Sequence, residues 1–161
     1  MTDPLPIFSE TNIIGVDPGP ATGFVTLHWP KGVITWPPEI HAYQCDAASA
    51  PLLLVMLLHT HRNWTGQMEH FVHGNLPNSP VTVRLENELG DVAEATGVRL
   101  ARRPMATVKP WASEKRLAAA GLIKAIPAKM VDARAAGRHG IYCSVNGAHL
   151  PDPLSKGARA L

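Results

Sequence analysis

The sequence predicts a single α/β domain of three layers, in which helices flank both faces of a five-stranded mixed sheet. A length of 161 residues suits one domain. Three apolar segments with short links precede Asp46, which is typical of an antiparallel meander. Strand-like and helix-like segments then alternate, which is typical of right-handed crossovers that add two parallel strands. We expect the domain to span residues 11–145, between a flexible arm (1–10) and a flexible tail (146–161).

The predicted strands are short apolar or alternating segments bounded by Gly, Pro and Asn turns. They cover residues 12–17, 21–29, 32–44 with a break at Pro37 and Pro38, 67–72, and 98–103. The predicted helices begin at Asp, Ser or Pro signals, and the second and third end at Gly97 and Gly121. They cover residues 47–61, 80–96, 110–120 and 127–142.

The side chains of two predicted helices have expected orientations. The first helix carries the run PLLLVMLL at residues 51–58, which is apolar all round and is expected to be mostly buried. The second helix is expected to bury one apolar stripe and to turn its acids outward. The stripe is Val81, Leu85, Leu89 and Val92, and the acids are Glu86, Asp91 and Glu94.

Charge is distributed unevenly along the chain. Residues 1–80 hold two Lys/Arg against six Asp/Glu, a net charge of −4, whereas residues 81–161 have a net charge of +6. A basic second half of the chain, together with a first half that holds a few acids, is compatible with a protein that binds a polyanionic substrate and holds metal ions with carboxylates. The alternative is that the basic residues form a solvated face, which is also common.

The composition argues against several classes of protein. The longest apolar run, residues 51–58, is far shorter than the ~20 residues that cross a bilayer, and the N-terminus lacks a basic start before an apolar stretch. We therefore expect no membrane partner and a cytoplasmic location. Cys45 and Cys143 lie in unrelated contexts, which gives little support to a disulfide or a zinc site.

Three acidic residues have predicted positions that would allow their carboxylates to lie close together. Asp17 ends the first predicted strand, Glu69 lies within the fourth, and Asp132 falls early in the last helix. Each also has an ordinary explanation, as a turn residue, an edge-strand residue and a solvated helix residue, respectively. If the first and fourth strands are neighbours, about 4.8 Å apart, Asp17 and Glu69 can touch one ion. Carboxylate oxygens favour Mg²⁺ or Mn²⁺ over zinc, and two such ions can hydrolyse a phosphodiester.

The segment IIGVDPGPATGFVTL, the Glu on the fourth strand and Val131-Asp132-Ala133 near the start of the last helix together resemble the RuvC family of Holliday-junction resolvases. The resemblance is greatest to compact phage-encoded members, and the family belongs to the ribonuclease H-like superfamily. It spans roughly residues 11–143. It implies a ribonuclease H-like fold and a metal-dependent, structure-selective DNA endonuclease that leaves 5′-phosphate and 3′-hydroxyl ends. Asp17, Glu69 and Asp132 would then be the catalytic ligands of Mg²⁺, for which Mn²⁺ can substitute.

The resemblance also implies contacts with branched DNA. Basic residues after the fifth strand would meet the phosphate backbone, and Phe71 is near a position where the family places an aromatic that stacks at the junction; the alternative is a core residue of the strand. The implied DNA contacts are Lys109, Lys115, Arg116, Lys129 and Phe71. A homodimer is expected because a two-fold junction needs two cuts.

Lys129 departs from the family pattern. Members commonly have an Asp or His as a fourth ligand one helical turn before the final Asp, and a charged lysine cannot ligate a metal. This favours, as a non-enzymatic alternative, a junction-binding protein that has lost efficient cleavage. Another alternative is an actin-like ATPase, whose phosphate loop also begins with a strand and Asp-x-Gly. That fold needs two such domains, and 161 residues supply one.

Overall fold

The computed structural model describes residues 9–71 and 79–158, which form five strands and six helices. The strands are β1 (Thr11–Asp17), β2 (Ala21–Trp29), β3 (Glu39–Asp46), β4 (Trp64–Glu69) and β5 (Leu100–Arg103). The helices are α1 (Ala50–Leu58), α2 (Pro80–Ala95), α3 (Met105–Trp111), α4 (Glu114–Ala119), α5 (Leu122–Ala125) and α6 (Val131–Asn146).

The five strands form one mixed sheet in the order β3-β2-β1-β4-β5. β2 pairs antiparallel with both β1 and β3, while β4 pairs parallel with β1 and β5 parallel with β4. This confirms the predicted topology of three antiparallel strands followed by two parallel ones. β1 therefore lies at the centre, where its run of apolar residues is buried on both faces.

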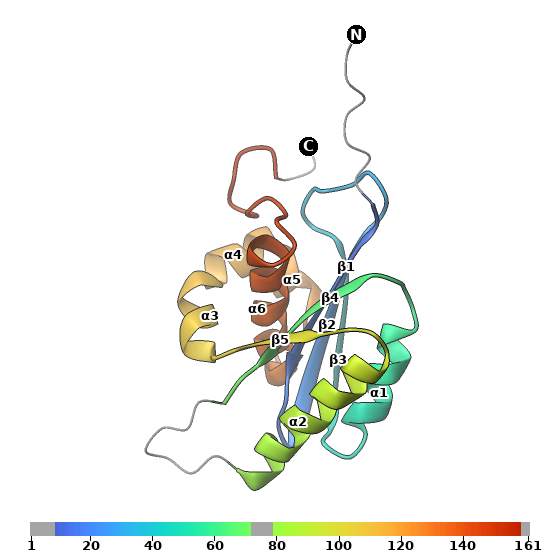
Figure 1. Ribbon diagram of the computed structural model, residues 1–161. Helices are drawn as coiled ribbons and strands as arrows, with labels where there is room; N and C mark the ends of the chain where they lie inside the picture. The colour runs from blue at the N-terminus through green and yellow to red at the C-terminus, as the bar shows by residue number, and fades with distance from the viewer. Residues whose placement is uncertain (1–8, 72–78, 159–161) are drawn as a thin grey trace.

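Helices cover both faces of the sheet, which confirms the three-layer architecture (Figure 1). α6 packs along β1, β2 and β4 on one face, together with α3, α4 and α5, and α1 and α2 cover the other. Alternation along β1 sends Ile13 into the core beneath α6, and Ile14 and Val16 into the core beneath α1 and α2. Asp17 shares the α6 face with Ile13, so its carboxylate points to the same side as the last helix.

Several predicted boundaries are wrong by a few residues. β4 begins at Trp64, three residues before the predicted start, because the turn is made at Asn63, where φ is +56°. The predicted helix 110–120 is two helices, since the chain bends at Ala112 and Ser113 caps α4 through its hydroxyl, which accepts from Arg116 N. The last helix starts at Val131 because residues 127–130 form a hydrogen-bonded turn.

The orientation of α1 and α2 also differs from the prediction. Leu52 and Met56 of α1 are 67% and 61% exposed, because α1 contacts the sheet through one side only. On α2, Val81 is exposed, whereas Glu86 is only 3% exposed. Apolar spacing alone predicts Glu86 to face solvent, whereas its polar partners are His70, just after β4, and Arg102 on β5.

Residues 147–158, which were expected to belong to a flexible tail, pack on the domain. The indole Nε1 of Trp36 donates to the Pro151 carbonyl at 2.8 Å, and the Trp36 amide donates to the Ala158 carbonyl. Arg116 and Asp152 form an ion pair at 2.9 Å. The expected arm, apart from its last two residues, and positions 159–161 lie outside the described residues. Within the described ranges, no helix is both long and apolar enough to cross a membrane.

Candidate metal centre

The strand register brings two of the predicted site residues together. β1 and β4 run parallel and are paired up to Val16 and Met68, so their last residues, Asp17 and Glu69, are neighbours at the same edge of the sheet. The turn after Asp17 is closed by Thr22, whose hydroxyl donates to the Gly19 carbonyl at 2.9 Å. The Asp-Pro-Gly turn and the ligand position predicted for Asp17 are thus compatible, because the turn follows the carboxylate.

The third carboxylate arrives on α6. Asp132 lies in the first turn of this helix, and its backbone N–H donates to Oε1 of Gln44 on β3 at 3.3 Å. Gly23 of β2, which pairs with Asp17 across the antiparallel ladder, lies directly beneath. A Cβ at Gly23 would overlap the backbone carbonyl of Asp132. The glycine therefore lets the start of α6 rest on the sheet beside Asp17.

A second glycine continues the close approach. A Cβ at Gly15 would overlap the carbonyl of Ala136 and lie 2.6 Å from Gly140 N, so α6 lies against the backbone of β1 as well. Further along α6, His139 is fully buried and its Nδ1 is 3.0 Å from Nε2 of Gln67, two residues before Glu69. Burial lowers the pKa of His139 to about 4, so it is neutral and acts as a packing and hydrogen-bonding residue.

The electrostatics of the carboxylate cluster, defined as Asp17, Glu69 and Asp132, indicate mutual repulsion. The pKa of Asp17 is raised from 3.8 to about 9, chiefly by burial, with further contributions from a hydrogen bond with Glu69 and from the charges of Glu69 and Asp132. Without a cation, Asp17 therefore keeps a proton at neutral pH. A bound divalent cation would replace this proton and neutralise the cluster.

The donor set fits a hard divalent cation, since all its side chains are carboxylates. The geometry is looser than a closed metal site. Asp17 and Glu69 lie within hydrogen-bonding reach of each other. When Asp132 is included, however, one oxygen from each of the three carboxylates does not give a group of atoms within 4.8 Å of one another. Asp132 lies on the facing helix, where its charge raises the pKa of Asp17 but its oxygens do not join those of Asp17 and Glu69 in one tight group.

The basic residues predicted to contact DNA have different surroundings. Lys109 on α3 lines a hollow of ≈ 340 Å³ between α3 and α6. Two other basic residues of this hollow, Arg134 and Arg138, are not among the predicted DNA contacts, although they lie four residues apart on one face of α6. Arg134 donates to the Ile126 carbonyl, and Arg138 donates to the Ala112 carbonyl and to Glu114. With Lys109 they give the hollow between α3 and α6 three basic side chains, two of which already donate within the protein.

Arg116 is engaged within the protein. Its guanidinium pairs with Asp152, donates to the Trp111 carbonyl at 2.9 Å and lies 4.5 Å from the centre of the Trp111 ring. This side chain therefore holds the C-terminal segment to α3, which differs from the DNA contact expected for it. Its neighbour Lys115 is exposed on α4.

Lys129 and Phe71 both lie outside regular elements. Lys129 is exposed in the turn that precedes α6, so it does not share a helix face with Asp132. Phe71 lies two residues beyond the end of β4, is half-buried and belongs to neither core cluster. The alternative of a core strand residue is therefore wrong, because the strand ends earlier than predicted.

The backbone at Phe71 is anchored by the buried Glu86. Glu86 Oε2 accepts from the Phe71 N–H at 3.4 Å, while Oε1 lies 2.7 Å from His70 Nδ1 and 3.2 Å from Arg102 Nη1. This network leads from α2 and β5 to the chain just after Glu69. The sequence does not predict this network, because no local pattern identifies a hydrogen-bond partner on another element.

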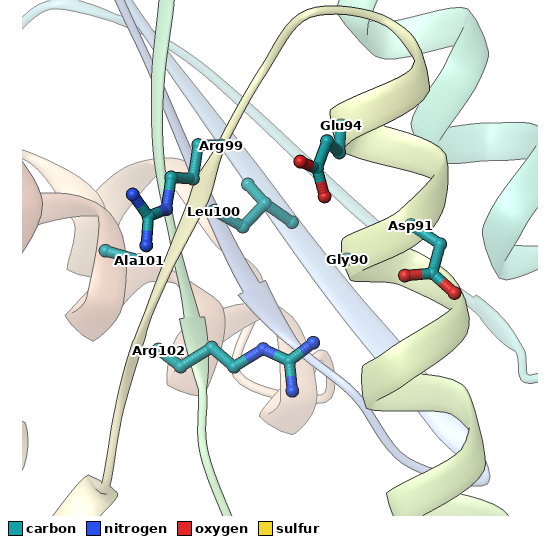
Figure 2. A pocket seen from close by; sticks show the side chains of 7 residues that line it. All are labelled: Gly90, Asp91, Glu94, Arg99, Leu100, Ala101 and Arg102. Carbon is teal, nitrogen blue, oxygen red and sulfur yellow. The ribbon is translucent and has the colours of Figure 1, made fainter.

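A second hollow, of ≈ 310 Å³, lies between α2 and β5 at the open edge of the sheet (Figure 2). It carries charges of both signs and contains none of the three carboxylates, so it is a poor site for a polyanion. Its lining residues are Gly90, Asp91, Glu94, Arg99, Leu100, Ala101 and Arg102.

Comparison with known proteins identifies the fold. No protein-family model and no curated protein sequence matches the chain. Among solved structures, the chain is similar to Thermus thermophilus RuvC, with a TM-score of 0.60 and 14% identity over 85% of this chain and 97% of that one. It is also similar to T. thermophilus RuvC in complex with a Holliday junction substrate, with a TM-score of 0.59 and 14% identity over 85% and 96% of the two chains. The chain therefore has the RuvC-like, ribonuclease H-like fold that its sequence predicts.

Proposed function

We propose that this protein is a structure-selective DNA endonuclease that cuts Holliday junctions or other branched DNA by metal-dependent phosphodiester hydrolysis. The observation that carries the proposal is the closeness of Asp17 and Glu69 at one edge of a RuvC-like sheet, with the start of α6, which bears Asp132, resting on Gly23 of the neighbouring strand. Burying carboxylates so close together is costly, and a site that binds cations explains why the fold accepts this cost. Cleavage would leave 5′-phosphate and 3′-hydroxyl ends.

Asp17, Glu69 and Asp132 would hold Mg²⁺, with Mn²⁺ able to substitute. When bound, the metal would supply an activated water and stabilise the leaving oxygen. The protein's own contribution is to place the carboxylates. β1 and β4 fix two of them by backbone pairing, and Gly23 lets the third approach the same edge. The basic hollow between α3 and α6 would position the phosphate backbone.

DNA contacts are assigned to the exposed basic residues around the cluster. Lys109 lies in the hollow between α3 and α6, Lys115 is on α4, and Lys129 precedes α6. Phe71, tied through its backbone to Glu86, would present its ring to the bases of the junction. A homodimer would make the two cuts that a two-fold junction requires. The location of this activity would be the cytoplasm.

The direct test is nicking of a synthetic four-way junction in Mg²⁺, compared with linear duplex of the same sequence. We expect cleavage of the junction only, and a gel shift of the junction in EDTA. A second candidate function, junction binding without efficient cleavage, is favoured by Lys129 and by the loose spacing of the three carboxylates. A gel shift without nicking in either Mg²⁺ or Mn²⁺ would establish this second function and refute the nuclease.

Metal binding should change the stability of the fold and its dependence on pH. Because the folded pKa of Asp17, about 9, lies above the unfolded value of 3.8, the folded chain binds the extra proton between these values. The free energy of unfolding of the metal-free protein should therefore fall as pH rises from 5 towards 9. Mn²⁺ at 100 times its dissociation constant should add about 2.7 kcal/mol. Thermal melts across pH and Mn²⁺ concentration measure both effects, and a melting temperature indifferent to Mn²⁺ would contradict the site.

Lys109 and Arg116 should behave differently when neutralised. Lys109→Gln is expected to weaken junction binding and to reduce the slope of log affinity against log salt by about 1, with little change in stability. Arg116→Gln breaks an ion pair whose side chains are 24% and 29% exposed, and should cost about 1 kcal/mol of stability while leaving the salt slope intact. Gel shifts at several salt concentrations and urea unfolding separate the two. The assignment fails if Arg116→Gln changes the salt slope as Lys109→Gln does.

A further inference from the structure

A second group of potential metal ligands lies at the other end of the sheet. Glu10 immediately precedes β1, His28 is near the end of β2, and His61 lies in the bend between α1 and β4. Their three ligand atoms lie within 4.8 Å of one another. β1 separates this group from Asp17 by its full length of seven residues, roughly 20 Å. The two sites are therefore distinct.

The side chains of this group converge on one another. Oε1 of Glu10 lies 3.1 Å from Nδ1 of His61 and 3.9 Å from Nδ1 of His28. The two imidazole rings are stacked, with centroids 4.3 Å apart and an interplanar angle of 18°. Three separate segments of the chain thus bring one carboxylate and two imidazoles to one point. His₂Glu is a donor set of known zinc sites, which commonly leave a further position open.

Asn12 is 1% exposed, and its side-chain amide contacts two members of this group. Its amide nitrogen donates to the Arg62 carbonyl at 2.7 Å and to Oε1 of Glu10 at 2.8 Å. These two bonds fix the orientation of the amide, so its Oδ1 faces Nδ1 of His28 at 2.6 Å. A cation that replaced the proton between these two atoms would meet an amide oxygen as a fourth donor. The buried amide thereby holds Glu10 and His28 in place before any ion binds.

We propose that Glu10, His28 and His61 form a binding site for a borderline divalent transition ion such as Zn²⁺, with Asn12 Oδ1 as an additional donor. Imidazole nitrogens select such ions over Mg²⁺, whereas the carboxylate cluster has oxygen donors only. The chain thus carries two sites of different chemistry at opposite ends of β1. A bound ion would tie residue 10 to β2 and to the bend before β4, which stabilises the start of the central strand.

The test uses the full chain, freed of metal, in a buffer containing excess Mg²⁺. Zn²⁺ is titrated by calorimetry, and Co²⁺ is added separately so that its visible absorption reports nitrogen ligation. We expect one high-affinity Zn²⁺ per chain and a rise in melting temperature. His61→Gln and Glu10→Gln alter exposed or half-exposed side chains, so they should fold normally and lose at least tenfold in Zn²⁺ affinity.

Two matched controls separate this site from others. His41→Gln removes an exposed histidine of β3 that pairs with Glu39 at 2.9 Å, so it should keep the wild-type Zn²⁺ affinity. Asp17→Asn, at the carboxylate cluster, should also keep it, which makes the result independent of the proposed nuclease. Absence of Zn²⁺ binding, or equal binding by the wild type and His61→Gln, would overturn the site.

Discussion

Asp17→Asn is expected to lower the rate of junction cleavage by at least about 10³-fold while leaving junction affinity within about twofold. The substitution removes the carboxylate that lies against Glu69, so the metal loses its central ligand. It also removes a group that folding forces to keep a proton at pH 8, because the pKa of Asp17 is about 9 in the folded chain and 3.8 in the unfolded chain. The metal-free variant should therefore be more stable than the wild type at pH 8, and its melting temperature should no longer respond to Mn²⁺.

Asp46→Asn provides the matched control for this experiment. Asp46 ends β3 opposite Ala21, at the same edge of the sheet, but its exposed carboxylate accepts from the Ser49 N–H at 2.9 Å. Asparagine can make the same bond, so cleavage should stay at the wild-type rate. Single-turnover nicking and gel shifts in EDTA give the two quantities needed. If Asp17→Asn loses binding as fully as it loses cleavage, the assignment of Asp17 as a metal ligand is wrong.

Gly15→Ala and Gly23→Ala are expected to be the most destabilising single methyl additions in the sheet. The added Cβ of either variant would overlap the backbone of α6, which cannot give way as a flexible side chain can. We expect losses of about 1–3 kcal/mol or more. Gly23→Ala should also displace Asp132 and so weaken the response of the melting temperature to Mn²⁺, whereas Gly15→Ala should affect chiefly stability.

Gly140→Ala tests the same interface from the helix side. Its Cβ would meet Leu27 Cδ1 at 3.4 Å, an ordinary contact, and alanine favours the helix by up to about 1 kcal/mol. This variant should be neutral or stabilising. Urea unfolding of the three proteins measures the differences. Equal stability of Gly15→Ala and Gly140→Ala would show that α6 does not lie as close to β1 as this fold requires.

The fold was predictable because its signals are local. The apolar run ending at Asp17, the short links of the meander and the later alternation of strands and helices were enough to predict the mixed sheet, and the strand order confirms them. The adjacency of Asp17 and Glu69 followed from that order, because parallel strands end at the same edge. The roles of these carboxylates in catalysis stay predictions.

The predictions of side-chain burial and of a flexible tail are wrong where contacts between residues remote in the sequence determine the structure. Glu86 is buried because His70, just after β4, and Arg102 on β5 pair with it, and the spacing of residues within α2 carries no information about them. The segment 147–158 looks mobile by composition, yet Trp36 and Arg116 hold it. No local pattern predicts the group of Glu10, His28 and His61 either, because these donors come from three separate segments.

The sequence by itself determined the succession of strands and helices and the elements that bear the three acids, because hydrophobic periodicity and turn chemistry act between near neighbours. Only the tertiary structure decided how closely α6 approaches the sheet, which basic side chains are already paired, and that Glu10, His28 and His61 meet. These features depend on distances between residues remote in the chain, which are set by the packing of whole elements and are not encoded at any one position.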